Sequence, residues 1–257
     1  TIIVVRRLVA PDLQRDRSPD RSARLVGVTL LAASLAAAAG MGGIATVQDP
    51  RPIFRSGVEL LAVELRERGS RVALLPGDLE DVRVPPVLVD RCRAELGTLD
   101  GLVMSHCESV DSSLLSTTVE SFDRHYAVNV RATWLLIKAF AEQVGPGGGC
   151  IIGLTSDHTV HNLPYGATKG ALNRVVLAAT HELADRGVRA NVIDPGPIDT
   201  GWMDEATRAS MAAATPGGEL AGPETTANLV RFLMSHQGSW VNGQLLLSNG
   251  GFKTPAV

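Results

Sequence analysis

Short apolar runs alternate with longer helical patterns along this 257-residue chain, and this alternation limits the folds it can adopt. The runs predicted as strands are Thr1–Val5, Gly43–Val47, Arg71–Leu75, Gly101–Ser105, Cys150–Thr155, Arg189–Ile193 and Gly243–Ser248. The patterns predicted as helices are Leu25–Ala39, Phe54–Arg68, Val84–Leu96, Thr117–Val144, Tyr165–Arg186, Met203–Ala214 and Pro223–His236. Fully apolar short strands separated by helices are typical of a parallel sheet that is covered on both faces.

This order predicts an α/β protein with a single Rossmann-like, doubly wound domain over residues 1–257. We expect a parallel seven-stranded sheet, joined by right-handed crossovers, with helices on both faces. Ligands of such sheets bind at the carboxyl ends of the strands. The sequence contains no repeat, low-complexity tract or interdomain linker that would indicate a second domain.

Composition narrows the classes of function. A net charge of −3 and a pI of about 6.1 give no electrostatic support for nucleic-acid binding. The three cysteines are spaced unlike a zinc site or a disulfide framework, so we expect no bound metal and a reducing, cytoplasmic location.

The apolar run 26–39 follows arginine-rich residues and resembles a signal peptide. Its 14 residues are too few to span a membrane, and we favour a buried helix.

The segment that carries the clearest chemistry contains Ser156, Tyr165 and Lys169. Ser156 follows a predicted strand, and Tyr-x-x-x-Lys opens a predicted helix. Residues four apart on a helix share one face, so the ammonium of Lys169 can lie beside the phenol of Tyr165. A nearby cation favours the phenolate and is expected to lower the pKa of the tyrosine from about 10. Ser156 would then hold a substrate oxygen while Tyr165 transfers the proton.

With these residues in place, the chain resembles the short-chain dehydrogenase/reductase family from about Val26 to Phe252. The similar stretches are Phe122–Leu136 with Asn129, the Ser-Tyr-Lys set, Asn191–Met203 with Pro195-Gly196, and Asn242 to Phe252. The resemblance implies that Asn129 is a fourth catalytic residue, which anchors a water that relays protons from Lys169. The alternative is a plain amide on a helix surface. Ser156 lies nine positions before the tyrosine, where the family usually has twelve or thirteen, so Thr155 and Thr159 are alternatives for its role.

The resemblance also implies an NADP or NAD site, but this part of the family pattern is eroded. The glycine-rich turn expected after the first strand is absent, and only Gly27 matches its last glycine. Met104–Cys107 replaces the small residues expected after the fourth strand, where His106 and Cys107 are expected to crowd the cofactor groove. The remaining cofactor-binding candidates implied by the family are Asp49, Asp78, Leu79, Pro195, Gly196, Ile198 and Thr200.

Residues 6–24 replace the glycine-rich turn with a charged insertion that has six arginines and three aspartates. Arginine side chains here could bind a pyrophosphate in place of the glycines. They could also dock an acidic partner such as an acyl carrier protein. The third interpretation, which we prefer, is a solvated insertion without a binding role.

Three functions follow from these observations. The first is an NAD(P)(H)-dependent ketoreductase or alcohol dehydrogenase, with Tyr165 as acid/base. It acts on a small molecule that Leu163, Trp202 and Met203 predict to be apolar. A natural-product ketone is the substrate class that the departures from the family pattern suggest. The second is a redox-neutral enzyme for dehydration, isomerisation, aldol-type or cyclisation chemistry. The third is a non-catalytic subunit that stabilises an active paralogue. Because the family assembles through paired long helices, we expect a homodimer or homotetramer.

Overall fold

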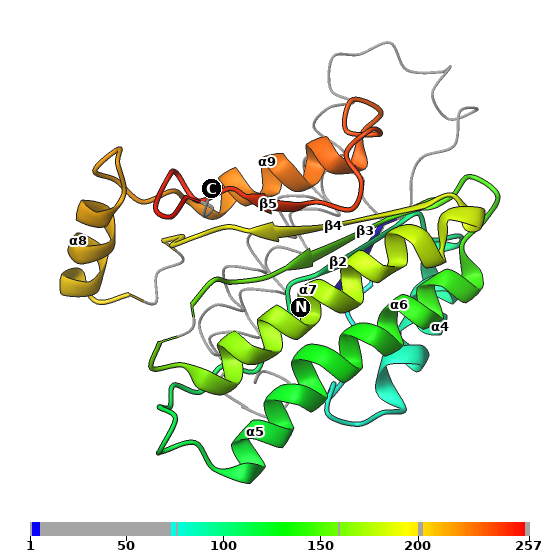
Figure 1. The fold of residues 1–257 in the computed structure, drawn as a ribbon. Helices are drawn as coiled ribbons and strands as arrows, with labels where there is room; N and C mark the ends of the chain where they lie inside the picture. The colour runs from blue at the N-terminus through cyan, green and yellow to red at the C-terminus, as the bar shows by residue number, and fades with distance from the viewer. Residues whose placement is uncertain (1, 6–72, 76, 159, 200–202, 255–257) are drawn as a thin grey trace.

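The computed structural model describes residues 2–5, 73–75, 77–158, 160–199 and 203–254, which form an α/β fold around one sheet (Figure 1). Within this part of the chain the sheet has five strands in the order β1-β2-β3-β4-β5. The strands are β1 (Ile2–Val5), β2 (Gly101–Met104), β3 (Gly149–Leu154), β4 (Val188–Asp194) and β5 (Leu245–Leu247). Strands β2 to β5 are parallel to one another, and β1 pairs antiparallel with β2.

Helices cover both faces of this sheet, as the doubly wound prediction requires (Figure 1). One face carries α4 (Val84–Leu96), α6 (Ala132–Gln143) and α7 (Leu163–Glu182), and the other carries α9 (Pro223–Met234). The chain enters α6 through α5 (Val119–Tyr126) and a π-helical turn, η3 (Ala127–Arg131). The remaining helices are the short 3₁₀ turn η4 (Ala184–Arg186) and α8 (Glu205–Ala214), which follows β4.

The alternating side chains of β4 show how the two layers are held. Ala190 and Val192 are fully buried against α7, where Leu172 and Val176 belong to the same apolar cluster. Ile193 points to the opposite face and packs with residues of α9. Because successive residues of a strand face opposite sides, Ala190 and Val192 belong to one cluster and Ile193 to the other, although Arg189 and Asn191 interrupt the apolar run.

The predicted parallel sheet requires two corrections. The Thr1–Val5 run does form a strand, but it pairs antiparallel, with Ile2 opposite Met104 and Val5 opposite Gly101. An antiparallel edge strand on an otherwise parallel sheet is common. The predicted strand Arg71–Leu75 is not regular in its described residues, 73–75. In the described part of the chain β2 is paired on both edges, with β1 and with β3.

The helix predictions agree well with the structure in the described part of the chain. The helix Val84–Leu96 has the predicted bounds, and α9 begins at the predicted Pro223. The predicted helix Thr117–Val144 is interrupted by η3, which residue propensity does not reveal. Thr118 caps its start, because the threonine side chain accepts a hydrogen bond from the Ser121 amide at 3.2 Å.

Several sequence predictions lie outside the described residues. These are the candidate cofactor residues Gly27, Asp49 and Thr200, the charged segment 6–24, the strand Gly43–Val47 and the helices Leu25–Ala39 and Phe54–Arg68. Among the helices that are described, none combines the length and the apolar character needed to cross a membrane.

Candidate active site

The carboxyl ends of β3 and β4 meet the start of α7, and the predicted Ser-Tyr-Lys set gathers there. Ser156 follows β3, while Tyr165 and Lys169 lie in the first two turns of α7. Lys169 is only 3% exposed, and its Nζ donates a hydrogen bond to the Leu154 carbonyl at 2.9 Å. The same Nζ lies 5.5 Å from the centre of the Tyr165 ring. The structure therefore brings the proposed proton donor and the cation together, as the four-residue spacing predicts.

Burial dominates the electrostatics of this pair. It raises the pKa of Tyr165 above the ordinary phenol value, and negative charge on Cys107 and on Asp194 acts in the same direction. A hydrogen bond with the Ser156 side chain opposes the rise. Burial also lowers the pKa of Lys169. The Tyr165 pKa thus moves in the direction opposite to the predicted fall, and burial is the largest cause of the rise. A lowering contribution from Lys169 stays a prediction.

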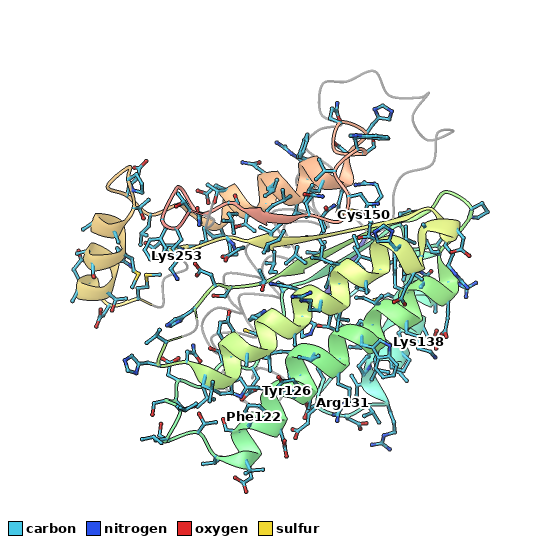
Figure 2. All side chains as sticks on the ribbon, in the orientation of Figure 1. Phe122, Tyr126, Arg131, Lys138, Cys150 and Lys253 are labelled. Atoms are coloured by element: carbon cyan, nitrogen blue, oxygen red, sulfur yellow. The ribbon has the colours of Figure 1, made fainter. Side chains whose placement is uncertain are left out.

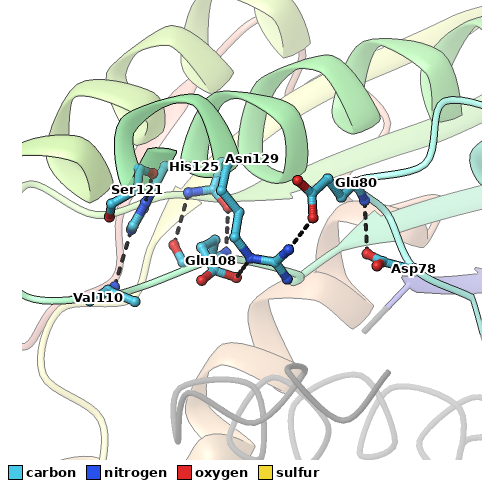
Figure 3. Close-up of polar contacts among 8 residues, drawn as sticks. Asp78, Glu80, Glu108, Val110, Ser121, His125 and Asn129 are labelled. Carbon is cyan, nitrogen blue, oxygen red and sulfur yellow. Dashed lines mark hydrogen bonds and ion pairs between the residues drawn. The ribbon is translucent and has the colours of Figure 1, made fainter. Parts of the chain in front are cut away.

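Asn129 is fully buried in the π-helical turn η3, so the alternative of a surface amide is wrong. Its Oδ1 accepts a hydrogen bond from the Glu108 amide at 2.6 Å, and its Nδ2 donates to the Glu108 carbonyl at 3.0 Å (Figure 3). The same Nδ2 donates to Thr168 Oγ1 at 2.9 Å. Asn129 thus links the segment that follows β2 to Thr168, the α7 residue next to Lys169. A water relay through Asn129 stays a prediction.

Ion pairs extend this network toward the candidate residues Asp78 and Leu79 (Figure 3). The guanidinium of Arg124 pairs with Glu80, and its Nε lies 3.2 Å from Glu108 Oε2. Asp78 accepts a hydrogen bond from the Glu80 amide at 3.0 Å. Leu79 is buried in an apolar cluster with residues of α4 and of the η3–α6 helix. The structure therefore connects the Asp78–Leu79 turn to the helix that carries Asn129.

The turn after β4 holds the candidates Pro195, Gly196 and Ile198. Gly196 has a φ of +65°, and a Cβ at this position would lie 2.4 Å from Cβ of Asn249. Only glycine fits both the left-handed backbone and this close approach. Ile198 forms an isolated parallel bridge with Ala221. The turn is thereby held against the segment that follows β5, at the same end of the sheet as Tyr165.

The structure adds to what the sequence indicates for two side chains near the site, His106 and Asp194. His106 is buried on the α6 side, where its Nε2 lies 3.3 Å from Thr133 Oγ1 and burial lowers its pKa well below the ordinary value. The His106 side chain thus packs against α6, and crowding of a cofactor groove by His106 and Cys107 stays a prediction. The sequence analysis does not single out Asp194, although an acidic residue at the end of a strand run is a usable signal of a functional site.

Among the described residues, no cluster of three or more histidine, cysteine or acidic side chains could hold a metal.

Comparison with known proteins identifies the family. A family model described as Enoyl-(Acyl carrier protein) reductase matches residues 24–253. A protein of Hericium erinaceus named short-chain dehydrogenase/reductase eriH is 30% identical over 201 residues, which are 74% of this chain and 80% of that protein. The chain belongs to the short-chain dehydrogenase/reductase family. An uncharacterized oxidoreductase of Bacillus subtilis (strain 168), YjdA, is 31% identical over 202 residues, or 76% of this chain and 80% of the relative.

Solved structures of similar proteins support the same family assignment. The angucycline C-6 ketoreductase LanV with bound NADP superposes with a TM-score of 0.72 at 25% identity, covering 77% of this chain and 82% of LanV. A blue fluorescent protein from a metagenomic library, in complex with NADPH, gives a TM-score of 0.73 at 27% identity and covers 79% and 85% of the two chains. The Rossmann-like fold is therefore confirmed, and this member of the short-chain dehydrogenase/reductase family is similar to NADP-bound proteins.

Proposed function

We propose that the protein is an NADP- or NAD-dependent ketoreductase that reduces an apolar ketone to an alcohol. The observation that carries this proposal is the buried pairing of Tyr165 with Lys169, beside Ser156, at the carboxyl ends of β3 and β4. Relatives named as oxidoreductases and neighbours named as NADP complexes support it. A natural-product ketone is the substrate class that we propose, as the name of LanV suggests for that protein.

The described residues fit a nicotinamide cofactor at its reactive end. The Lys169 ammonium has three N–H donors, and the hydrogen bonds of the described residues give it one acceptor, the Leu154 carbonyl. Its further donors suit the hydroxyl groups of a ribose. When bound, the nicotinamide would supply the hydride. The glycine-turn candidate Gly27 and the acidic candidate Asp49 lie outside the described residues.

The protein side chains then handle the substrate oxygen. Because the raised pKa of Tyr165 keeps its phenol protonated at neutral pH, this side chain is suited to donate a proton to a carbonyl oxygen. The Ser156 hydroxyl, which interacts with the Tyr165 phenol, would donate a hydrogen bond to the same oxygen.

Calorimetric titration with NADPH, NADH, NADP⁺ and NAD⁺ tests the cofactor part of the proposal. We expect binding of one of these nucleotides with a Kd on the order of micromolar, or about −8 kcal/mol. A ribose-pyrophosphate fragment without nicotinamide serves as the control for binding through phosphate alone. Absence of binding up to millimolar concentration contradicts the nicotinamide enzyme and favours redox-neutral acid/base chemistry at Tyr165.

A second proposal concerns the assembly of the protein, which we infer to be a homodimer or homotetramer. The outer face of α5, η3 and α6 has a groove of about 590 Å³ lined by Asp123, Tyr126, Ala127, Val130, Arg131, Trp134 and Val175. Trp134 is 53% exposed. The rings of Phe122 and Tyr126 lie together with their centres 4.9 Å apart and their planes tilted by 34° (Figure 2). An antiparallel second copy would place Asp123 of one chain near Arg131 of the other.

The substitution Trp134→Glu is expected to shift the protein toward the monomer. It places a carboxylate where the second copy would cover an apolar ring, and a desolvated charge weakens such a contact strongly. Light scattering coupled to size-exclusion chromatography measures the mass of the wild type and the variant. The control is Trp240→Glu, because Trp240 is an exposed tryptophan away from the groove. A monomeric wild type would contradict the assembly.

Three further expectations stay predictions: a paralogous subunit, a carrier protein bound through residues 6–24, and a cytoplasmic location.

A further inference from the structure

The loop from Cys107 to Thr118, between β2 and α5, depends on hydrogen bonds for its position. No residue from 107 to 124, all of which the structure describes, is buried. A segment with few buried apolar contacts opens easily unless hydrogen bonds hold it. Two side chains of the α5–η3 helix supply such bonds to the backbone of the loop. Asn129 binds Glu108, and His125 binds the amide of Val110 (Figure 3).

His125 is fully buried and uses both of its ring nitrogens. Its Nδ1 lies 2.6 Å from the carbonyl oxygen of Ser121, one turn earlier in α5, and its Nε2 lies 3.1 Å from the amide nitrogen of Val110 (Figure 3). A carbonyl oxygen can only accept a hydrogen bond, and a backbone N–H can only donate one. The two partners therefore fix the ring as the neutral tautomer that carries its proton on Nδ1 and accepts at Nε2.

The same loop reaches the helix that carries Tyr165. The carbonyl of Ser112, two residues along the loop from the His125 contact, accepts a hydrogen bond from the amide of Leu163 at 3.1 Å. Leu163 is the first residue of α7, and the first amides of a helix have no partner within it. Asn162 precedes α7 without making a side-chain capping bond, so Ser112 supplies a partner from a distant part of the chain.

We propose that His125 is a positioning residue that determines where the phenol of Tyr165 lies. The ring holds the loop through the Val110 amide, and the loop holds the first residue of α7, two positions before the tyrosine. The inference deepens the proposed function and rests on it, because Tyr165 is the proton donor there. The position of the loop and of the phenol can be measured without a cofactor, so the inference is testable even if nicotinamide binding fails.

The tautomer of His125 is measured by nuclear magnetic resonance of wild-type protein labelled with ¹⁵N at histidine, at neutral pH. The nitrogen chemical shift distinguishes a protonated ring nitrogen from an unprotonated one. The chain contains six histidines, and sequential assignment identifies the signals of His125. We expect a proton on Nδ1 and none on Nε2. A proton on Nε2 overturns the proposal, because this nitrogen then cannot accept the Val110 hydrogen bond.

Two variants differ in the acceptor that the proposal requires. In His125→Gln the side-chain oxygen can lie near the former position of Nε2 and accept from the Val110 amide. In His125→Asn the shorter side chain can still donate to the Ser121 carbonyl, but none of its atoms reaches Val110. Both variants lose the imidazole ring, so the loss of ring packing is common to them.

Amide hydrogen exchange reports whether the loop is held. At Val110 and Leu163 we expect exchange to accelerate by roughly fivefold to tenfold in His125→Asn, the factor that corresponds to one hydrogen bond. In His125→Gln both amides are expected to exchange at close to the wild-type rate. Equal acceleration in the two variants, or none in His125→Asn, overturns the proposal.

The phenol provides a separate readout. The chain contains two tyrosines, so protein labelled with ¹³C at tyrosine Cζ gives two signals, and Tyr126→Phe assigns them. We expect the Tyr165 signal to shift in His125→Asn and to keep its wild-type position in His125→Gln. An unchanged Tyr165 signal in His125→Asn, together with faster exchange at Val110, overturns the proposal, because His125 then holds the loop without positioning the phenol.

Kinetics separates positioning from cofactor binding. His125→Asn is expected to lower kcat by roughly tenfold to a hundredfold while the Kd for NADPH changes by less than about twofold, because only the phenol is displaced. His125→Gln is expected to restore most of kcat, and equal losses of kcat in both variants overturn the proposal. If the wild type binds no nicotinamide nucleotide, the proposed function fails, whereas the tautomer, the amide exchange and the tyrosine signal still decide the role of His125.

Discussion

The substitution Tyr165→Phe is expected to lower kcat for carbonyl reduction by about 10²–10⁴-fold, the usual contribution of a positioned proton donor. The phenyl ring keeps the packing at the start of α7 and removes only the hydroxyl. Turnover is measured as NADPH oxidation over a panel of apolar ketones, and cofactor affinity is measured in parallel by calorimetry. We expect affinity to change little, because the loss concerns the proton-transfer step rather than binding.

The chain offers a matched control, since it contains only two tyrosines, Tyr126 and Tyr165. Tyr126→Phe removes the same hydroxyl from α5 on the outer, groove-lining side of the helices. Activity close to that of the wild type is expected for this control. Equal, measurable activities of Tyr165→Phe and the wild type would remove Tyr165 from the proton-transfer step. Absence of turnover in the wild type as well would leave the non-catalytic subunit as the better interpretation.

The substitution Asn129→Ala is expected to destabilise the protein by about 3 kcal/mol. Asn129 holds both the amide and the carbonyl of Glu108 and also bonds Thr168. Alanine leaves these polar groups without their partner, and each unsatisfied buried group costs roughly 1–3 kcal/mol. Urea denaturation of the variant and the wild type measures the difference in free energy of unfolding.

Asn173→Ala is the matched control for this prediction. Asn173 lies on α7, and its Oδ1 has no hydrogen-bond partner among the described residues. Replacing an amide oxygen that bonds nothing in the described part of the chain is expected to cost well under about 1 kcal/mol. Equal losses in the two variants would show that the Asn129 contacts contribute little and that the common effect comes from helix packing.

Much of the fold could be predicted because burial is visible in the sequence as apolar runs. The runs that became β2, β3 and β4 lie within one residue of their predicted bounds, since most residues of each strand are apolar and buried. The direction of β1 could not be predicted, because a four-residue apolar strand carries no signal for its partner or orientation. The run at 71–75 looks equally strand-like, yet its described residues, 73–75, have no strand partner.

The site was predictable where spacing alone determines geometry. Tyr165 and Lys169 meet because four residues make about one helical turn. The direction of the tyrosine pKa was not predictable, since it depends on how deeply the phenol is buried and on Cys107 and Asp194, which are distant in sequence. Asn129 was expected from the family resemblance, but its contacts with Glu108 and Thr168 depend on how three separate segments pack.

The π-helical turn η3 has a consequence for changes in chain length. A π turn holds one more residue than the α-helical turn it replaces, so it is equivalent to a single-residue insertion in a continuous helix. Deleting Val130 would let α5 and α6 join as one regular α-helix, and the residues on either side of the turn would keep their relative phase, because the π turn takes up the extra residue locally. Asn129 would lose its alignment with Glu108 and Thr168, although the helix itself would gain regular hydrogen bonding. The π turn η3 therefore lacks regular α-helical hydrogen bonding, and its geometry orients the Asn129 side chain toward Glu108 and Thr168.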